Sequence, residues 1–138
     1  MPSSRLTLRN RSSLVKSALL VDGEDAGRRS VRRHLELRGW LVLEAASGEI
    51  ALDLVIADKV QVDAVVVDMG LLGLSGSALC ARIKALRPTL ADRIIVASSD
   101  AYGAMQALER EQLECPILAK PFELDDLDQL LDVIVTTS

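Results

Sequence analysis

The chain has 138 residues, with 16 basic and 20 acidic side chains and a formal net charge of −4. This length suits one ordinary domain with a buried core, and no apolar run approaches the roughly 20 residues that cross a bilayer. A membrane-spanning protein is therefore excluded, and we expect a soluble protein of the cytoplasm.

Residues 1–17 hold four basic side chains and no acidic one. We predict a disordered extension here, while a membrane contact, a nucleic-acid contact and a targeting role stay open. Residues 18–138 are left with 12 basic side chains against 20 acidic ones, and we assign them to one folded domain. Because phosphate contacts need clustered Lys and Arg, this domain is not expected to bind nucleic acid.

From Ser17 onward, short apolar segments alternate with longer amphipathic ones, as in repeated strand–helix units. Apolar segments rich in β-branched residues predict strands at 18–21, 41–45, 64–67, 94–97 and 117–119. Helices are predicted at 25–38, from Ser47, from Ser75 or Ser77 to Leu86, at 102–112 and at 124–135. The fold class is therefore α/β, a doubly wound, flavodoxin-like parallel sheet of five strands in the order 2-1-3-4-5.

The helix predicted at 25–38 places four arginines opposite its apolar side. Two interpretations of these arginines, which include Arg28 and Arg32, stay open: they form a solvated helix face, or they contact an acidic partner surface. His34, the only histidine, is predicted to lie on the same helix surface. Since no nucleophile is near it in sequence, a Ser-His or metal-His mechanism is not expected.

Polar side chains follow four of the five predicted strands. They are Asp22 and Glu24 after the first strand, Asp68 after the third, Ser98 after the fourth and Lys120 after the fifth. In doubly wound sheets, sites open at the carboxyl ends of the strands, where the winding direction reverses. An isolated Asp after a strand is usually a turn or a helix cap, but this matched set predicts a site.

The set suits phosphoryl transfer to a carboxylate. Acidic oxygens bind Mg²⁺, which prefers hard ligands and usually engages phosphate as well. The metal and the side chains of Lys120 and Ser98 would stabilise charge on the phosphoryl oxygens while one carboxylate acts as nucleophile. Asp68 is central in the predicted sheet and is therefore the predicted nucleophile.

These segments resemble the receiver domains of two-component response regulators, over residues 17–135. The resemblance lies in the order and spacing of Leu19-Leu20-Val21-Asp22, Asp63-Ala64-Val65-Val66-Val67-Asp68, Gly73-Leu74-Ser75-Gly76, Ile95-Val96-Ala97-Ser98-Ser99 and Leu118-Ala119-Lys120-Pro121-Phe122.

The resemblance implies a phosphorelay switch rather than an enzyme, with at most Mg²⁺-dependent self-phosphorylation and autodephosphorylation. A sensor histidine kinase or a phosphotransfer protein would phosphorylate Asp68. Asp22, Asp68 and the backbone carbonyl of Gly70 would bind Mg²⁺, with Glu24 as a further candidate ligand. The family also implies a cis bond before the proline that follows Lys120.

The implied output is a change in the face formed by the helix at 102–112, the strand at 117–119 and the helix at 124–135. An output protein would bind this face, and a homodimer is a further option. Whether the chain acts alone, shuttles phosphoryl groups or is part of a longer protein stays open.

Three departures from the family pattern support a second hypothesis. Gly23 stands where a second acid is usual, Ile117 replaces an aromatic residue, and Leu113-Glu114 replaces a Gly-Ala pair. In addition, Leu72 replaces a proline after the acceptor. The alternative is a degenerate receiver that binds a partner without being phosphorylated.

Other chemistries fit the sequence less well. Gly70 stands where a haloacid-dehalogenase-like phosphatase needs a second acid, and Asp22-Gly23-Glu24 provides neither a dinucleotide-binding turn nor a P-loop. The two cysteines, Cys80 and Cys115, follow neither a metal-site spacing nor a disulfide pattern, so free thiols are expected.

Overall fold

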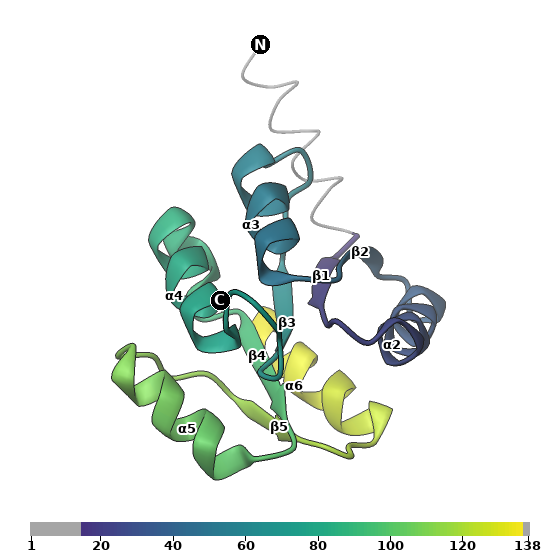
Figure 1. Ribbon diagram of the computed structural model, residues 1–138. Coiled ribbons are helices and arrows are strands. Elements are labelled where there is room, and N and C mark those ends of the chain that lie inside the picture. The colour runs from purple at the N-terminus through teal and green to yellow at the C-terminus, as the bar shows by residue number, and fades with distance from the viewer. Residues whose placement is uncertain (1–14, 137–138) are drawn as a thin grey trace.

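Figure 1 shows the computed structural model, which describes residues 15–136. Its sheet contains five strands, β1 (Ser17–Val21), β2 (Leu41–Ala45), β3 (Ala64–Asp68), β4 (Ile94–Ser98) and β5 (Ile117–Ala119). All neighbouring strands are parallel, and their order is β2-β1-β3-β4-β5. The predicted fold class and strand order are confirmed.

The helices begin and end near their predicted bounds. They are α2 (Asp25–Leu37), α3 (Gly48–Ala57), α4 (Gly76–Leu86), α5 (Ala101–Arg110) and α6 (Leu124–Thr136), with a 3-10 turn, η1, at Pro88–Leu90. Ser47 caps α3 by accepting a hydrogen bond from the amide of Ile50 at 3.1 Å. Ser75 caps α4 in the same way, from the amide of Ala78 at 3.2 Å. Local capping chemistry therefore sets where these helices start.

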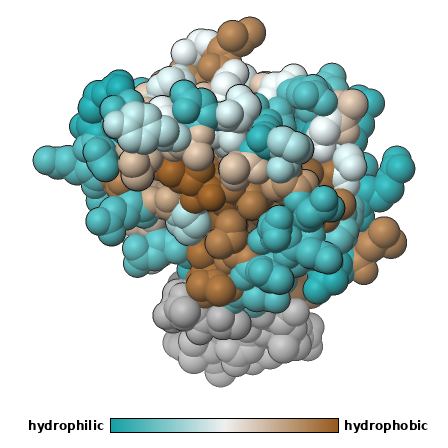
Figure 2. All heavy atoms as spheres, turned by 90° about the horizontal axis from the view of Figure 1, so that it is seen from below, coloured by the Kyte–Doolittle hydropathy of each residue, from teal (hydrophilic) through white to brown (hydrophobic). Residues whose placement is uncertain are grey.

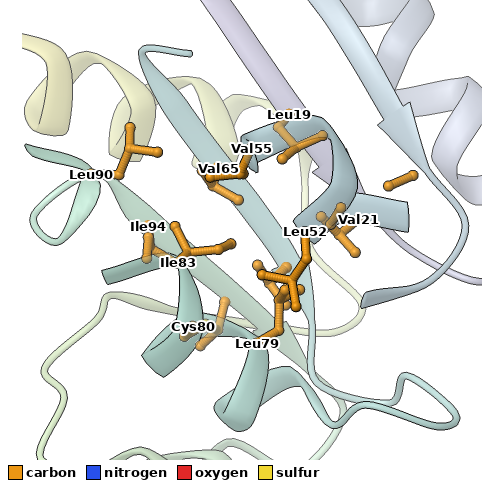
Figure 3. Close-up of a cluster of buried hydrophobic side chains, with 14 of the residues drawn as sticks. Leu19, Val21, Leu52, Val55, Val65, Leu79, Cys80, Ile83, Leu90 and Ile94 are labelled. Carbon is orange, nitrogen blue, oxygen red and sulfur yellow. The ribbon is translucent and has the colours of Figure 1, made fainter. Parts of the chain in front are cut away.

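Two apolar clusters hold the layers together, one on each face of the sheet. The larger joins β1, β3 and β4 to α3, α4 and α5, and Figure 3 shows Leu19, Val65 and Ile94 of the sheet facing Leu52 and Ile83 of the helices. The smaller cluster lies under α2 and α6, which occupy the other side of the sheet in Figure 1. Each fully buried Leu, Ile or Val contributes about 1.5–3 kcal/mol.

The helices α2 and α6 are also joined by a polar contact. Nε2 of His34 lies 2.9 Å from a carboxylate oxygen of Asp128, and Nε of Arg38 lies 3.4 Å from the other. His34 keeps part of its predicted helix-surface position, but its side chain is only 23% exposed because it contacts Asp128. It has a structural partner on a neighbouring helix.

The basic extension predicted at 1–17 lies mostly outside the described residues. The structure describes the chain from Val15, and β1 begins at Ser17, whose amide donates to the buried carboxylate of Asp63 at 2.8 Å. Between residues 15 and 136, every helix is too short or too polar to cross a membrane.

Candidate functional site

The strand ends bring the predicted site residues to one edge of the sheet. The pairing register places Val21 beside Val67, Asp68 beside Ala97, and Ser98 beside Ala119. Asp22 directly follows β1 and Lys120 directly follows β5. Because parallel strands end on the same side of a sheet, residues almost 100 positions apart become neighbours.

Asp22, Asp68 and Lys120 form the centre of the site. Nζ of Lys120 lies 3.2 Å from Oδ1 of Asp68 and 3.9 Å from Oδ2 of Asp22. The three side chains are 32%, 17% and 21% exposed for Lys120, Asp68 and Asp22, so a small solute can reach them. The peptide bond between Lys120 and Pro121 is cis, as predicted.

Burial and a neighbouring carboxylate disfavour the charged form of Asp22. Burial raises the pKa of Asp22 above its ordinary value, and the charge of Asp68 raises it further. The amide of Glu24, which donates to Asp22 at 2.9 Å, and the ammonium group of Lys120 act in the opposite direction. One lysine therefore only partly compensates two carboxylates, and the pair attracts a further cation.

The loop after β3 folds back over Asp68. The amide of Gly70 donates to Oδ1 of Asp68 at 3.2 Å, and a Cβ atom at Gly70 would lie 3.7 Å from both carboxylate oxygens. The Gly70 peptide is thus adjacent to the predicted nucleophile. The carbonyl oxygen of Gly70, on the next peptide unit of this loop, is a neutral candidate ligand.

Ser98 is at the site but does not face Asp68. Its hydroxyl donates to the carbonyl of Asp100 at 2.9 Å and accepts from the amide of Asp100 at 2.9 Å. The side chain is turned toward its own loop. Contact with a group on Asp68 requires Ser98 to exchange these two hydrogen bonds for others.

Glu24 is also oriented away from the two carboxylates. Its amide points to Asp22, but its side-chain oxygen Oε1 lies 3.2 Å from where a Cβ atom of Gly27 would be, over the first turn of α2. Within residues 15–136, no three His, Cys, Asp or Glu side chains are grouped in a way that could hold a metal ion. The acidic part of the site therefore consists of Asp22 and Asp68.

The donor set still fits Mg²⁺. Two carboxylates and a backbone carbonyl are hard oxygen ligands, and Mg²⁺ is usually bound through one or two carboxylates together with water and phosphate. Burial is the main cause of the raised pKa of Asp22, and a cation beside the two acids would favour the charged form of this carboxyl group.

Arg28 positions the loop that carries Asp22, and sequence reasoning missed it. The side chain is only 10% exposed; its Nη1 donates to the carbonyl of Asp22 at 2.7 Å and its Nε to Glu44 at 3.0 Å. Arg28 is therefore neither a solvated residue of the helix face nor a contact for a partner surface. The only sequence signal is an acid at position 44 in an otherwise apolar strand.

Replacing Arg28 by Gln is expected to lower the free energy of unfolding by about 2 kcal/mol, because the carbonyl of Asp22 loses its charged donor and the half-buried Glu44 keeps only Arg32. Urea denaturation measures this change. Arg29→Gln, at an exposed position of the same helix, is the matched control and should leave stability nearly unchanged. Equal stability of the two variants would contradict the positioning role.

Comparison with known proteins agrees with this geometry. The sequence model of the response regulator receiver domain matches residues 18–132. The response regulator MprA of Mycolicibacterium vanbaalenii is 32% identical over 109 residues, which are 79% of this chain and 46% of the relative. The regulatory protein DctD of Rhizobium meliloti is 32% identical over 117 residues, 85% of this chain and 25% of the relative. The chain thus spans less than half the length of these curated relatives.

Solved structures with the same fold include a receiver domain protein from Clostridium thermocellum. It is 25% identical, with a TM-score of 0.78 and coverage of 89% of this chain and 96% of that one. A response regulator from Burkholderia pseudomallei, solved with a phosphorylated aspartic acid, a calcium ion and citrate, is 25% identical. Its TM-score is 0.74, and the match covers 88% of this chain and 69% of that one.

Proposed function

Because the chain belongs to the response regulator receiver domain family, we propose that Asp68 accepts a phosphoryl group from a histidine kinase or a phosphotransfer protein. The observation that carries the proposal is the contact of one ammonium group with two carboxylates at the strand ends, at 3.2 Å and 3.9 Å. This arrangement offers a nucleophile, a cation site and a positive charge within one accessible pocket.

In the proposed reaction, a carboxylate oxygen of Asp68 attacks the phosphorus atom of a phosphohistidine. The new P–O bond forms as the P–N bond breaks, and the imidazole of the donor leaves. Lys120 faces the phosphoryl oxygens and offsets their negative charge. The product is an acyl phosphate on Asp68.

We propose that Asp22, Asp68 and the carbonyl of Gly70 hold Mg²⁺ for this reaction. When bound, the ion withdraws negative charge from the phosphoryl group. The Burkholderia pseudomallei relative has a calcium ion together with its phosphorylated aspartic acid, which supports a divalent cation here. Glu24 joins the ligands only if its side chain leaves the first turn of α2.

Phosphorylation would then act as a switch. The hydroxyl of Ser98 leaves Asp100 and turns to the phosphoryl oxygens, which moves the loop that follows β4. The change reaches the face formed by α5, β5 and α6. Figure 2 shows hydrophobic residues gathered in a band on the side of the molecule where these elements lie in Figure 1. We propose this face as the contact for an output protein or a second receiver in the cytoplasm.

Incubation of the purified protein with Mg²⁺ and a small phosphodonor tests the proposal. The expected result is a mass gain of one phosphoryl group and a shift on a phosphate-affinity gel, both absent in Asp68→Asn. The carboxamide keeps the size of the side chain but is a poor nucleophile. Equal modification of wild type and Asp68→Asn would show that another residue is the acceptor.

A second function is favoured by one observation, the absence of a third acidic side chain from the described site. In this case the domain binds its partner through the same face without being phosphorylated. The two functions differ in their need for Asp68. Partner binding that is unchanged in Asp68→Asn, together with no phosphorylation at high Mg²⁺, supports the second.

A further inference from the structure

A groove lies between α5 and the segment that leads into β5. It encloses about 540 Å³, which is within the range of typical ligand pockets, roughly 300–1,000 Å³. Its apolar lining consists of Met105, Leu108, Leu113, Cys115, Pro116 and Ile117. Leu108 and Leu113 are almost fully buried, whereas Met105 is 42% exposed. The groove can therefore receive a few apolar side chains of a partner.

Two acidic side chains line the same groove. Glu109 and Glu114 are both exposed, and they also line an adjoining pocket of about 450 Å³ that continues the groove toward Lys84 of α4. Among the salt bridges between residues 15 and 136, none uses Glu109 or Glu114. Their negative charges are therefore available to a partner that enters the groove.

The face formed by α5, β5 and α6 is acidic as a whole. Residues 101–136 carry eight acidic and two basic side chains, a net charge of −6, although the whole chain has a net charge of only −4. One of the two bases, Lys120, lies beside Asp68 and not on the outer surface of this face. Apart from Asp128, which contacts His34, all eight acids are exposed. The negative charge of the chain is thus concentrated on this face.

Two of the departures from the family pattern build the groove. Leu113-Glu114 stands where a Gly-Ala pair is usual, and both residues line the groove. Leu113 supplies apolar surface and Glu114 supplies negative charge, neither of which Gly-Ala would provide. Ile117, in place of an aromatic residue, adds an aliphatic side chain where the groove meets β5. These replacements give the groove a chemistry of its own.

We propose, on the basis of the output role proposed for this face, that the groove binds a basic amphipathic helix of an output protein. Apolar side chains on one side of that helix fill the lining beside Met105 and Ile117. Lys or Arg side chains next to them pair with Glu109 and Glu114 at the rim. Apolar contact supplies the affinity, and the charges select the partner.

A second copy of this chain fits the groove less well than a basic helix does. A two-fold dimer brings the same patch of both copies together, so Glu109 and Glu114 would meet an equally acidic surface. Like charges across an interface cost free energy and suppress the wrong partner. The charge of the face therefore favours a basic output protein over a homodimer.

Fluorescence anisotropy with a labelled helical peptide of about 18 residues, or five turns, tests the proposal on the full chain. The peptide has leucines along one side and lysines on the other, and its control has glutamates in place of the lysines. We expect the lysine peptide alone to bind. Glu114→Lys should weaken this binding about tenfold. The matched control is Asp53→Lys, an equal charge reversal at an exposed position of α3, which α4 separates from α5 in Figure 1; it should change the affinity little.

A second pair of variants tests the apolar lining. Met105→Gln should weaken binding of the lysine peptide about fivefold, because the docked helix loses apolar contact. Ile56→Gln, at a position of α3 that is 59% exposed, is the matched control and should bind as wild type does. In amide NMR spectra of the labelled full chain, the lysine peptide should shift signals from residues 105–117 and leave those of α3 in place.

Three results would overturn the proposal. They are equal binding of the two peptides, an equal loss of affinity in Glu114→Lys and Asp53→Lys, and a wild-type dimer in light scattering that Glu114→Lys dissociates, which would make a second copy the occupant. Asp68→Asn should bind the lysine peptide as the unphosphorylated wild type does. Failure of the groove to bind the peptide and failure of Asp68 to accept a phosphoryl group are therefore separate results.

Discussion

Replacing Lys120 with methionine is expected to slow the phosphorylation of Asp68 by a small phosphodonor about 100-fold, the typical effect of removing one donor that stabilises developing charge. The ammonium group of Lys120 lies 3.2 Å from Asp68. Methionine has a similar length but no charge, so the negative charges of the carboxylates and of the incoming phosphoryl group lose their cation.

The time course of phosphorylation on a phosphate-affinity gel measures this effect. The matched control is Lys59→Met, at an exposed position after α3, where the chain returns toward the opposite end of the sheet. The control should keep the wild-type rate. If Lys120→Met also kept it, Lys120 would have no part in the proposed transfer.

Replacing Gly23 with aspartate is expected to raise Mg²⁺ affinity about tenfold, because a third carboxylate replaces a neutral position beside Asp22 and Asp68. The backbone accepts the change: a Cβ atom at Gly23 would meet only the carbonyl oxygen of Ala46, at an ordinary distance of 3.5 Å. The gain stays well below the full Coulomb attraction because the added charge is also repelled by its neighbours.

Isothermal titration of Mg²⁺ into the variants measures this gain. Gly23→Asn is the neutral control of similar size and should bind Mg²⁺ about as wild type does. Glu24→Gln should also bind as wild type, since its carboxylate lies over α2 in this structure. A tenfold loss in Glu24→Gln would instead make Glu24 a further carboxylate ligand, and an unchanged affinity in Gly23→Asp would contradict a metal site beside position 23.

The periodicity of the sequence predicts the parts of the site that are carried by strand ends. Each strand of the buried sheet is a short apolar run, so the polar residue that follows it is easy to identify. The winding rule then brings Asp22, Asp68 and Lys120 together. In the structure, a carboxylate oxygen of each Asp lies within 4 Å of Nζ of Lys120. Backbone topology alone therefore determines which side chains meet at the centre of the site.

The periodicity of the sequence does not predict where side chains in loops point, or which side chains far apart in sequence come into contact. The pattern of α2 makes its four arginines look alike. Arg28 and Arg32 both bond Glu44, but Arg28 also donates to the Asp22 carbonyl, and that difference arises from how α2 packs on β2. The turn of Ser98 toward Asp100 also depends on a local loop.

Chemical location of the phosphoryl group tests the central claim most directly. Borohydride reduces an acyl phosphate, so treatment of the phosphorylated chain should convert the modified aspartate to homoserine, which peptide mass spectrometry can locate. We predict conversion at position 68 and at no other carboxylate. Homoserine at Asp22 or at any other acid, or a phosphorylated chain with an unconverted Asp68, would contradict the proposed function.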